Sequence, residues 1–181
     1  SHDRPQGKYE EVKPLYERSL SIRRAALGDD HPAVALALNN LASMLRHQGM
    51  YDEAKPLFER AIAIDEKALG PDDPGLAADL NNFAALNAAQ GNFEEAKTLA
   101  LRGLDIRIKS LGETNQSVAQ SQSTLGWIYG DHGDLDKATE SHRAALKICE
   151  HLDESNPRKQ LVRVGVLVNE ARRLRAAGEP H

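Results

Sequence analysis

Apolar residues recur three or four positions apart along most of the chain, and this is the spacing of one face of a helix. One such stripe contains Ala37, Leu38, Leu41, Ala42 and Leu45. A second stripe follows at Ala54, Leu57, Phe58, Ala61, Ile62 and Ile64. Alanine and leucine dominate the composition, and aromatic residues make up only 4%. Both observations favour helices over strands and predict an all-α chain.

Two series of glycines interrupt these stripes at a constant interval of 42 residues. The phrase Ala-Leu-Gly or Ser-Leu-Gly ends at Gly28, Gly70 and Gly112. The second series is Gly7, Gly49, Gly91 and Gly133, and Gly178 follows after a shift of three residues. The residues that follow Gly7 also match those that follow Gly49 almost position by position. Such internal repetition is the signature of a helical-repeat array.

Each period predicts two helices, here called the first and the second helix of a pair. Pro32 and Pro74 lie near the start of a first helix, where a missing N–H costs nothing, and Thr114 or Asn115 can cap the third. We expect one array spanning 1–181, with about eight helices. Its parts are a lone second helix at 8–27, helix pairs at 31–69, 73–111 and 115–152, and a lone first helix at 158–177.

One position of the first helix is small in every pair, where Ala42, Ala84 and Gly126 occur. A small residue at a fixed position lets two helix backbones approach closely. Each pair has too little apolar area to bury its face alone, so neighbouring pairs are expected to stack into a continuous core.

Several phrases resemble the tetratricopeptide repeat, in the 42-residue subtype found in kinesin light chains. They are Ala-Leu-Gly-Asp-Asp-His-Pro-Ala-Val-Ala at 26–35, Leu-Asn-Asn-Leu-Ala at 38–42 and Gly-Met-Tyr-Asp-Glu-Ala-Lys-Pro-Leu-Phe-Glu-Arg-Ala at 49–61. The resemblance implies a right-handed superhelical solenoid of antiparallel helix pairs. It also implies that an extended peptide binds in a concave groove lined by the first helices, where asparagines recur.

Carried onto this chain, the resemblance places the recurring asparagine at Asn40 and Asn82, with Thr124 in the third pair. If the three-residue shift is allowed for, Asn169 takes this place in the last helix. An amide can donate to a peptide carbonyl and accept from a peptide N–H, which suits a backbone-binding row. The alternative is structural, with each asparagine bonded to an adjacent helix. The full expected groove is Asn39, Asn40, Ser43, Arg46, His47, Asn81, Asn82, Thr124, Trp127, Asn169 and Arg172.

Two kinds of side chain on the expected groove have open alternatives. Trp127 is either a core residue or an exposed binding hot spot. Arg46, His47, Arg172 and Arg175 either select an acidic peptide or belong to a solvated face.

The remaining chemistry points to binding rather than catalysis. The formal net charge is −4 and no apolar run approaches 18 residues, so neither a nucleic acid nor a membrane is the expected partner. The histidines and the single Cys149 form no metal motif or nucleophile motif, and no cofactor or catalytic residue is expected. A cytoplasmic location fits this composition.

We therefore expect a protein- or peptide-binding scaffold that is not an enzyme. The alternative is a homo-oligomer that associates through apolar solenoid ends. The absence of an initiator Met suggests a fragment, so the segment could also be the sensor or targeting part of a larger protein.

Overall fold

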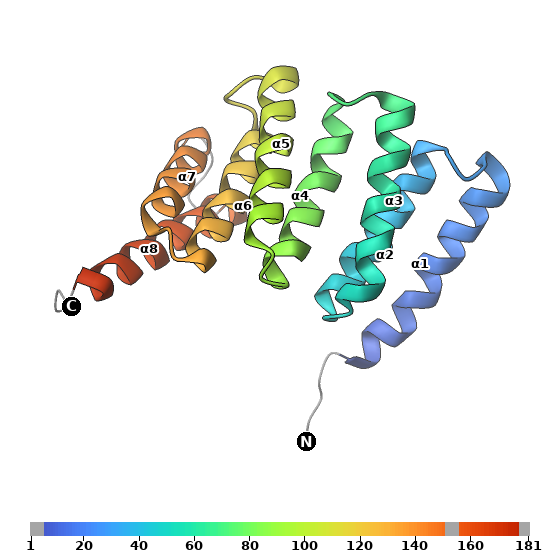
Figure 1. Cartoon of the computed structure of the whole chain (residues 1–181), viewed down its shortest axis with the longest axis horizontal. Helices are drawn as coiled ribbons and strands as arrows, with labels where there is room; N and C mark the ends of the chain where they lie inside the picture. The colour runs from blue at the N-terminus through green and yellow to red at the C-terminus, as the bar shows by residue number, and fades with distance from the viewer. Residues whose placement is uncertain (1–5, 151–155, 178–181) are drawn as a thin grey trace. The chain divides into compact units, whose positions relative to one another are not determined.

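The computed structural model describes residues 6–150 and 156–177, with side chains from residue 12 onward. Within these residues all regular secondary structure is helical, and there are eight helices, as the repeat predicts (Figure 1). The end of the third expected pair, at 151–152, and Gly178 lie outside the described residues. The helices are α1 (Gln6–Leu27), α2 (Pro32–His47), α3 (Tyr51–Leu69), α4 (Pro74–Ala89), α5 (Phe93–Leu111), α6 (Gln116–His132), α7 (Leu135–Ile148) and α8 (Pro157–Ala177).

Six glycines of the two series end helices in a backbone conformation that other residues rarely adopt. Gly28, Gly49, Gly70, Gly91, Gly112 and Gly133 have φ angles between 78 and 94°. Glycine has no Cβ and adopts positive φ at little cost, so it reverses the chain between consecutive helices. Gly7 is the exception, because it lies inside α1 and ends no helix.

Side-chain oxygens and one imidazole satisfy N–H groups at the starts of the first helices. Asn115 Oδ1 accepts from Ser117 N at 2.8 Å, so Asn115 rather than Thr114 caps α6. Asp73 Oδ1 accepts from Gly75 N at 2.7 Å. His31 Nδ1 accepts from Ala33 N at 3.1 Å and caps α2. These caps fix where the first helices begin.

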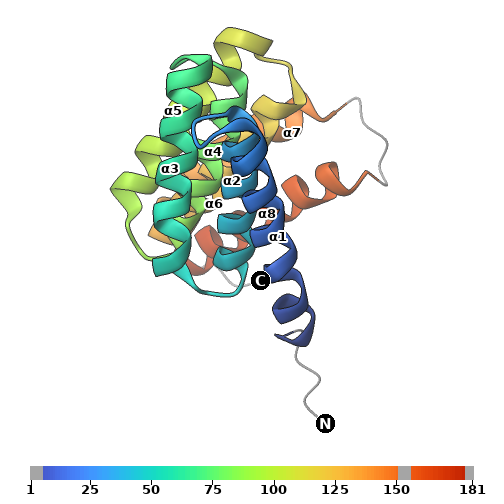
Figure 2. The same cartoon turned by 90° about the vertical axis from the view of Figure 1, so that its right-hand side faces the viewer.

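Residue contacts separate the chain into two compact units, 1–86 and 87–181, so the single array spanning 1–181 stays a prediction. In the first unit α2 packs against both α1 and α3, as Figures 1 and 2 show. Phe58 of α3 is fully buried, and its ring stacks on that of Phe83 in α4, with centroids 5.9 Å apart. Together with the fully buried Ala42 of α2, these rings form part of the core.

In the second unit α6 packs against α5 and α7, and α8 packs against α7 and, less extensively, α6. His142 of α7 is fully buried between two glycines, Gly126 of α6 and Gly165 of α8. A Cβ atom at either glycine would collide with the imidazole ring. Gly126, where a small residue was expected, therefore makes room for the His142 ring of α7, the second helix of this pair.

The exposure of one repeated isoleucine shows how much burial depends on neighbouring helices. Ile64 and Ile106 are 1% and 2% exposed, whereas Ile22, 42 residues before Ile64, is 58% exposed. Ile64 lies on α3, which packs against α2, the first helix of its own pair. Ile22 lies on α1, which precedes the first complete pair. A complete pair is thus needed to bury this position.

The same substitution at these two equivalent positions is expected to have different costs. Ile64→Ala removes buried methyl groups and leaves a cavity, so the free energy of unfolding should fall by about 2–5 kcal/mol. Ile22→Ala should change it by no more than about 1 kcal/mol, because most of the side chain is already in water. Urea unfolding followed by circular dichroism measures both values. Equal losses would contradict the burial described above.

Candidate functional site

The outward face of α2 is a polar row that begins and ends with exposed residues. Asn40 and His47 are exposed and Ser43 between them is half-buried. The three residues are spaced three and four positions apart, so they lie on one side of the helix. Leu36, one turn before Asn40, is 51% exposed. Leu36 is not among the residues expected from the sequence, although its spacing from Asn40 could have identified it as part of this face.

The paired asparagines divide their roles between the core and the surface. Asn39 and Asn81 are buried, whereas Asn40 is exposed and Asn82 is half-buried. Asn82 Nδ2 donates to Asn39 Oδ1 at 3.2 Å, and this bond joins α4 to α2. The structural alternative therefore describes Asn82, which bonds to an adjacent helix although it is still partly accessible, whereas Asn40 is exposed.

The last turn of α2 carries a basic pair. Arg46 Nη2 lies 3.0 Å from His47 Nε2, and Arg46 Nε is buried without a hydrogen-bond partner among the described residues. Burial lowers the pKa of the Arg46 guanidinium, which remains charged. Burial, and then the charge of Arg46, lower the pKa of His47, so its imidazole is neutral at pH 7. One cationic group therefore lies beside the amide row.

In the second unit the expected residues are more strongly engaged with the protein itself. Thr124 is half-buried, and its Oγ1 donates to Gln120 O of the same helix at 3.1 Å. Trp127 is also half-buried and meets the His142 ring edge-on, with centroids 5.0 Å apart. Trp127 is therefore partly a core residue, where it packs against His142, and partly accessible to a ligand.

The structure does not place Asn169 on an exposed face. Asn169 is fully buried, and its Nδ2 lies 3.0 Å from His142 Nδ1. The shift of three residues inferred from Gly178 therefore gives the wrong orientation for this part of α8. Because Gly126 of α6 and Gly165 of α8 both lie against the His142 ring of α7, Asn169 of α8 is turned inward.

Arg172 is exposed, but its guanidinium is already bonded within the second unit. Its Nη1 donates to Gly130 O at 3.1 Å and lies 3.7 Å from Asp131 Oδ1. The expected selection of acidic side chains by Arg172 would have to compete with both contacts.

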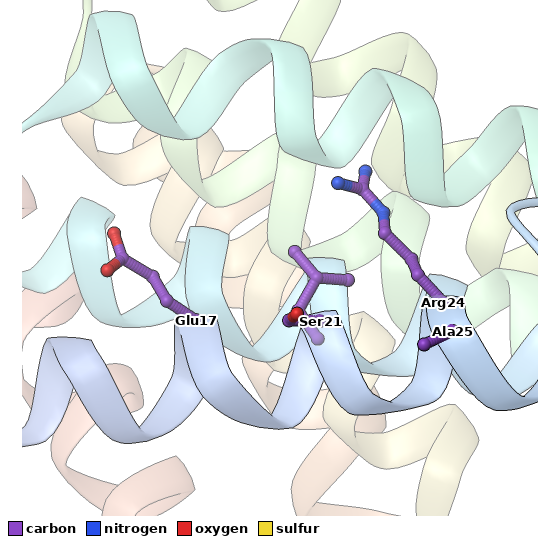
Figure 3. Close-up of a pocket in the computed structure, with 5 residues that line it drawn as sticks. Glu17, Ser21, Arg24 and Ala25 are labelled. Atoms are coloured by element: carbon purple, nitrogen blue, oxygen red, sulfur yellow. The ribbon is translucent and has the colours of Figure 1, made fainter.

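Neither a surface hollow nor the polar clusters and the single cysteine of the described residues add a second reactive site. A surface hollow of about 560 Å³ is lined by five residues of α1, and Figure 3 shows Glu17 and Arg24 extending from the same side of that helix. Arg24 Nε already lies 3.4 Å from Asp29 Oδ1, so its charge is partly compensated. Among the described residues no group of three or more His, Cys, Asp or Glu side chains is placed to hold a metal ion. Burial raises the pKa of the Cys149 thiol, which keeps it protonated and unreactive.

No helix within 6–150 or 156–177 is long and apolar enough to cross a lipid bilayer.

The paired helices and the glycine turns define a helical-repeat protein. The tetratricopeptide repeat model matches three overlapping stretches, residues 2–67, 34–109 and 77–151. The chain therefore belongs to the tetratricopeptide repeat family, whose repeats generally mediate protein–protein interactions. No curated protein matches the sequence.

Solved structures share this fold at low sequence identity. BtubC (BKLC) from P. vanneervenii superposes with a TM-score of 0.73 at 23% identity, covering 97% of this chain and 77% of that one. A kinesin light chain protein of Podosopora anserina with nearly identical TPR-like repeats superposes with a TM-score of 0.73 at 24% identity. The match covers 96% of this chain and 84% of that one. The N-terminal domain of stress-induced protein-1 (STI-1) from C. elegans superposes with a TM-score of 0.54 at 19% identity. The match covers 77% of this chain and 96% of that one. At these identities the likeness shows the fold alone.

Two asparagines of the expected row should respond differently to alanine. Asn169→Ala removes a fully buried amide that contacts His142, whose Nδ1 keeps Ala138 O as a partner, so the free energy of unfolding should fall by about 1–3 kcal/mol. Asn40→Ala changes an exposed position and should alter it by less than about 0.5 kcal/mol. Chemical denaturation of the two variants, side by side, tests this assignment. If Asn40→Ala proves as costly as Asn169→Ala, then Asn40 is structural as well.

Proposed function

We propose that this chain is a non-catalytic scaffold that binds an extended peptide segment of another protein. The proposed binding face in the first unit is the outward side of α2 together with Asn82 of α4. The observation that carries the proposal is the arrangement of Asn40 and Asn82 at equivalent outward positions 42 residues apart, with Asn82 bonded to the buried Asn39.

An amide row of this kind suits a peptide backbone better than it suits any one side chain. Each amide offers an N–H donor and a carbonyl acceptor, which match the alternating groups of an extended strand. The bond between Asn82 and Asn39 holds one of these amides in place before a ligand arrives. Preorganisation of this kind lowers the entropy cost of binding.

Neighbouring side chains would then set the preference for one peptide over another. Leu36 offers apolar surface and Arg46 offers a positive charge beside the row. In the second unit Thr124 and the accessible part of Trp127 would contribute a similar face, with the Trp ring as an anchor. A short peptide held by a few such contacts is expected to bind with a Kd of about 1 μM or weaker.

The proposal assigns different roles to the other expected residues. Asn39 and Asn81 lie behind the face, and Asn169 supports the packing of α8. Ser43 and His47 stay on the face, whereas Arg172 would contribute only by exchanging its contact with Asp131.

A peptide-display selection against the purified chain should yield a convergent motif. The motif should be lost with the double variant Asn40→Ala and Asn82→Ala, with Kd rising at least tenfold, while the circular dichroism spectrum remains unchanged. Asn92→Ala serves as the matched control, because Asn92 is exposed in the turn before α5 and is not one of the residues of the proposed face.

If the selected peptide binds the double variant as tightly as the parent chain, then Asn40 and Asn82 do not bind the peptide. If the folded parent enriches no peptide at all and its mass by light scattering rises with concentration, self-association becomes the better account. The observation that favours this alternative is the exposed apolar surface of the two terminal helices, with Leu15 and Ile22 on α1 and Leu161 and Leu167 on α8.

A further inference from the structure

One repeat position of the second helices carries an arginine in two of the helices and a carboxyl group in a third. Arg23, Asp65 and Arg107 are spaced 42 residues apart. Arg23 Nη1 donates to Ala33 O at 3.1 Å, and Arg107 Nη1 donates to Ser117 O at 2.8 Å and to Ser121 Oγ at 2.9 Å. At both places a guanidinium joins a second helix to the start of the following first helix. Asp65 cannot make this bond, because an ionised carboxylate has no donor.

The residue that faces Asp65 is another acid, Asp79 of α4. The two carboxyl groups are hydrogen-bonded to each other and are only 7% and 4% exposed. Asp65 Oδ1 and Asp79 Oδ2 are buried without a hydrogen-bond partner among the described residues. Two buried carboxylates in contact cannot both be ionised cheaply, so a shared proton is the stable arrangement.

The surrounding helices supply no compensating positive charge in the described part of the first unit. Asp73, in the turn between α3 and α4, adds a further negative charge near Asp65. Of the three basic groups on α3, Lys55 is exposed, and Arg60 and Lys67 are both bonded to Asp30. The charged or titratable residues of α2 are confined to its last turn, and Asp79 is the only one on α4. The negative charge of the pair is therefore balanced only by its proton.

We propose that the Asp65–Asp79 pair is a proton-dependent clasp that holds α3 against α4. With one proton shared, the two carboxyl groups bond to each other and the helices stay packed. When the proton leaves, two buried like charges repel and the contact between α3 and α4 loosens. This behaviour belongs to the fold of the first unit and does not depend on a bound ligand.

The pH range over which the clasp weakens follows from the direction in which the pKa values of Asp65 and Asp79 are shifted. Burial, and then the charge of Asp65, raise the pKa of Asp79 to about 8, and burial also raises the pKa of Asp65. A carboxyl group whose pKa is raised by folding stabilises the folded state fully below its unfolded pKa of about 4. That contribution is lost as the pH rises toward the folded value. The stabilisation by the clasp should therefore fall progressively from about pH 4 to about pH 8, and near pH 8 the proton leaves the folded pair itself.

The test compares urea unfolding of the parent chain and of Asp79→Asn between pH 6 and pH 9. Asparagine keeps the shape and can donate to Asp65, but it does not titrate. The ratio of the folding constants, parent to variant, should fall at least tenfold over this range, because the histidines and other acids common to both proteins cancel. Asp72→Asn, in an exposed turn, is the matched control and should leave a ratio that does not change with pH.

Two further measurements keep the test decisive if Asp79→Asn folds poorly. The side-chain carboxyl carbon signals of ¹³C-labelled aspartate should include one that titrates well above pH 6 in the parent chain. Asp65→Arg places an arginine at the repeat position and should abolish this loss of stability with rising pH, because the guanidinium pairs with Asp79. Aspartate signals that all titrate below pH 5, or parent and variant curves that run parallel, would overturn the clasp.

Discussion

The rest of this structure depends on a buried ring that the second helix carries at one repeat position in the first and third helix pairs, where the first helix has a small residue. In the second unit the His142 ring lies between Gly126 and Gly165, where no Cβ could be accommodated. In the first unit Phe58 is fully buried, and Ala42 occupies the position equivalent to Gly126. Interiors are packed as tightly as organic crystals, so these contacts fix how closely the helices approach and how each is rotated. The rotation in turn decides which asparagines face solvent.

The contrast between Asn40 and Asn169 follows from this constraint. Around Phe58 the helices leave Asn40 outside, and Asn82 is held at the surface by its bond to Asn39. Around the smaller, polar His142 the last helix places Gly165 against the ring and Asn169 within 3.0 Å of the imidazole. Trp127 packs edge-on against that same ring, which is why only part of it is left for a partner. The rotation of each helix about its axis thus determines both which residues form the core and which form the proposed binding face.

The repeat made the fold predictable, because two glycine series at a constant interval mark the helix ends without any tertiary information. The outward position of Asn40 was predictable for the same reason. The rotation of α8 was not, since the interval changes before it and a shift counted from Gly178 does not determine how a helix turns about its axis. The contacts of Arg172 with Gly130 and Asp131 depend on that rotation too. The sequence indicates the Asp65–Asp79 pair only through Asp65, an acid at a repeat position that carries arginine in two equivalent helices.

The central claim is that the outward face of the first helices binds a partner's extended segment. The most direct measurement is an NMR titration of the ¹⁵N-labelled chain with a peptide from the display selection, followed through the side-chain amide signals of asparagine. The account predicts that the signals of Asn40 and Asn82 shift together with backbone signals on the outward side of α2, while Asn169 and the outer surfaces of α3 and α5 stay unchanged. Shifts confined to the second helices, with Asn40 and Asn82 unaffected, would contradict it.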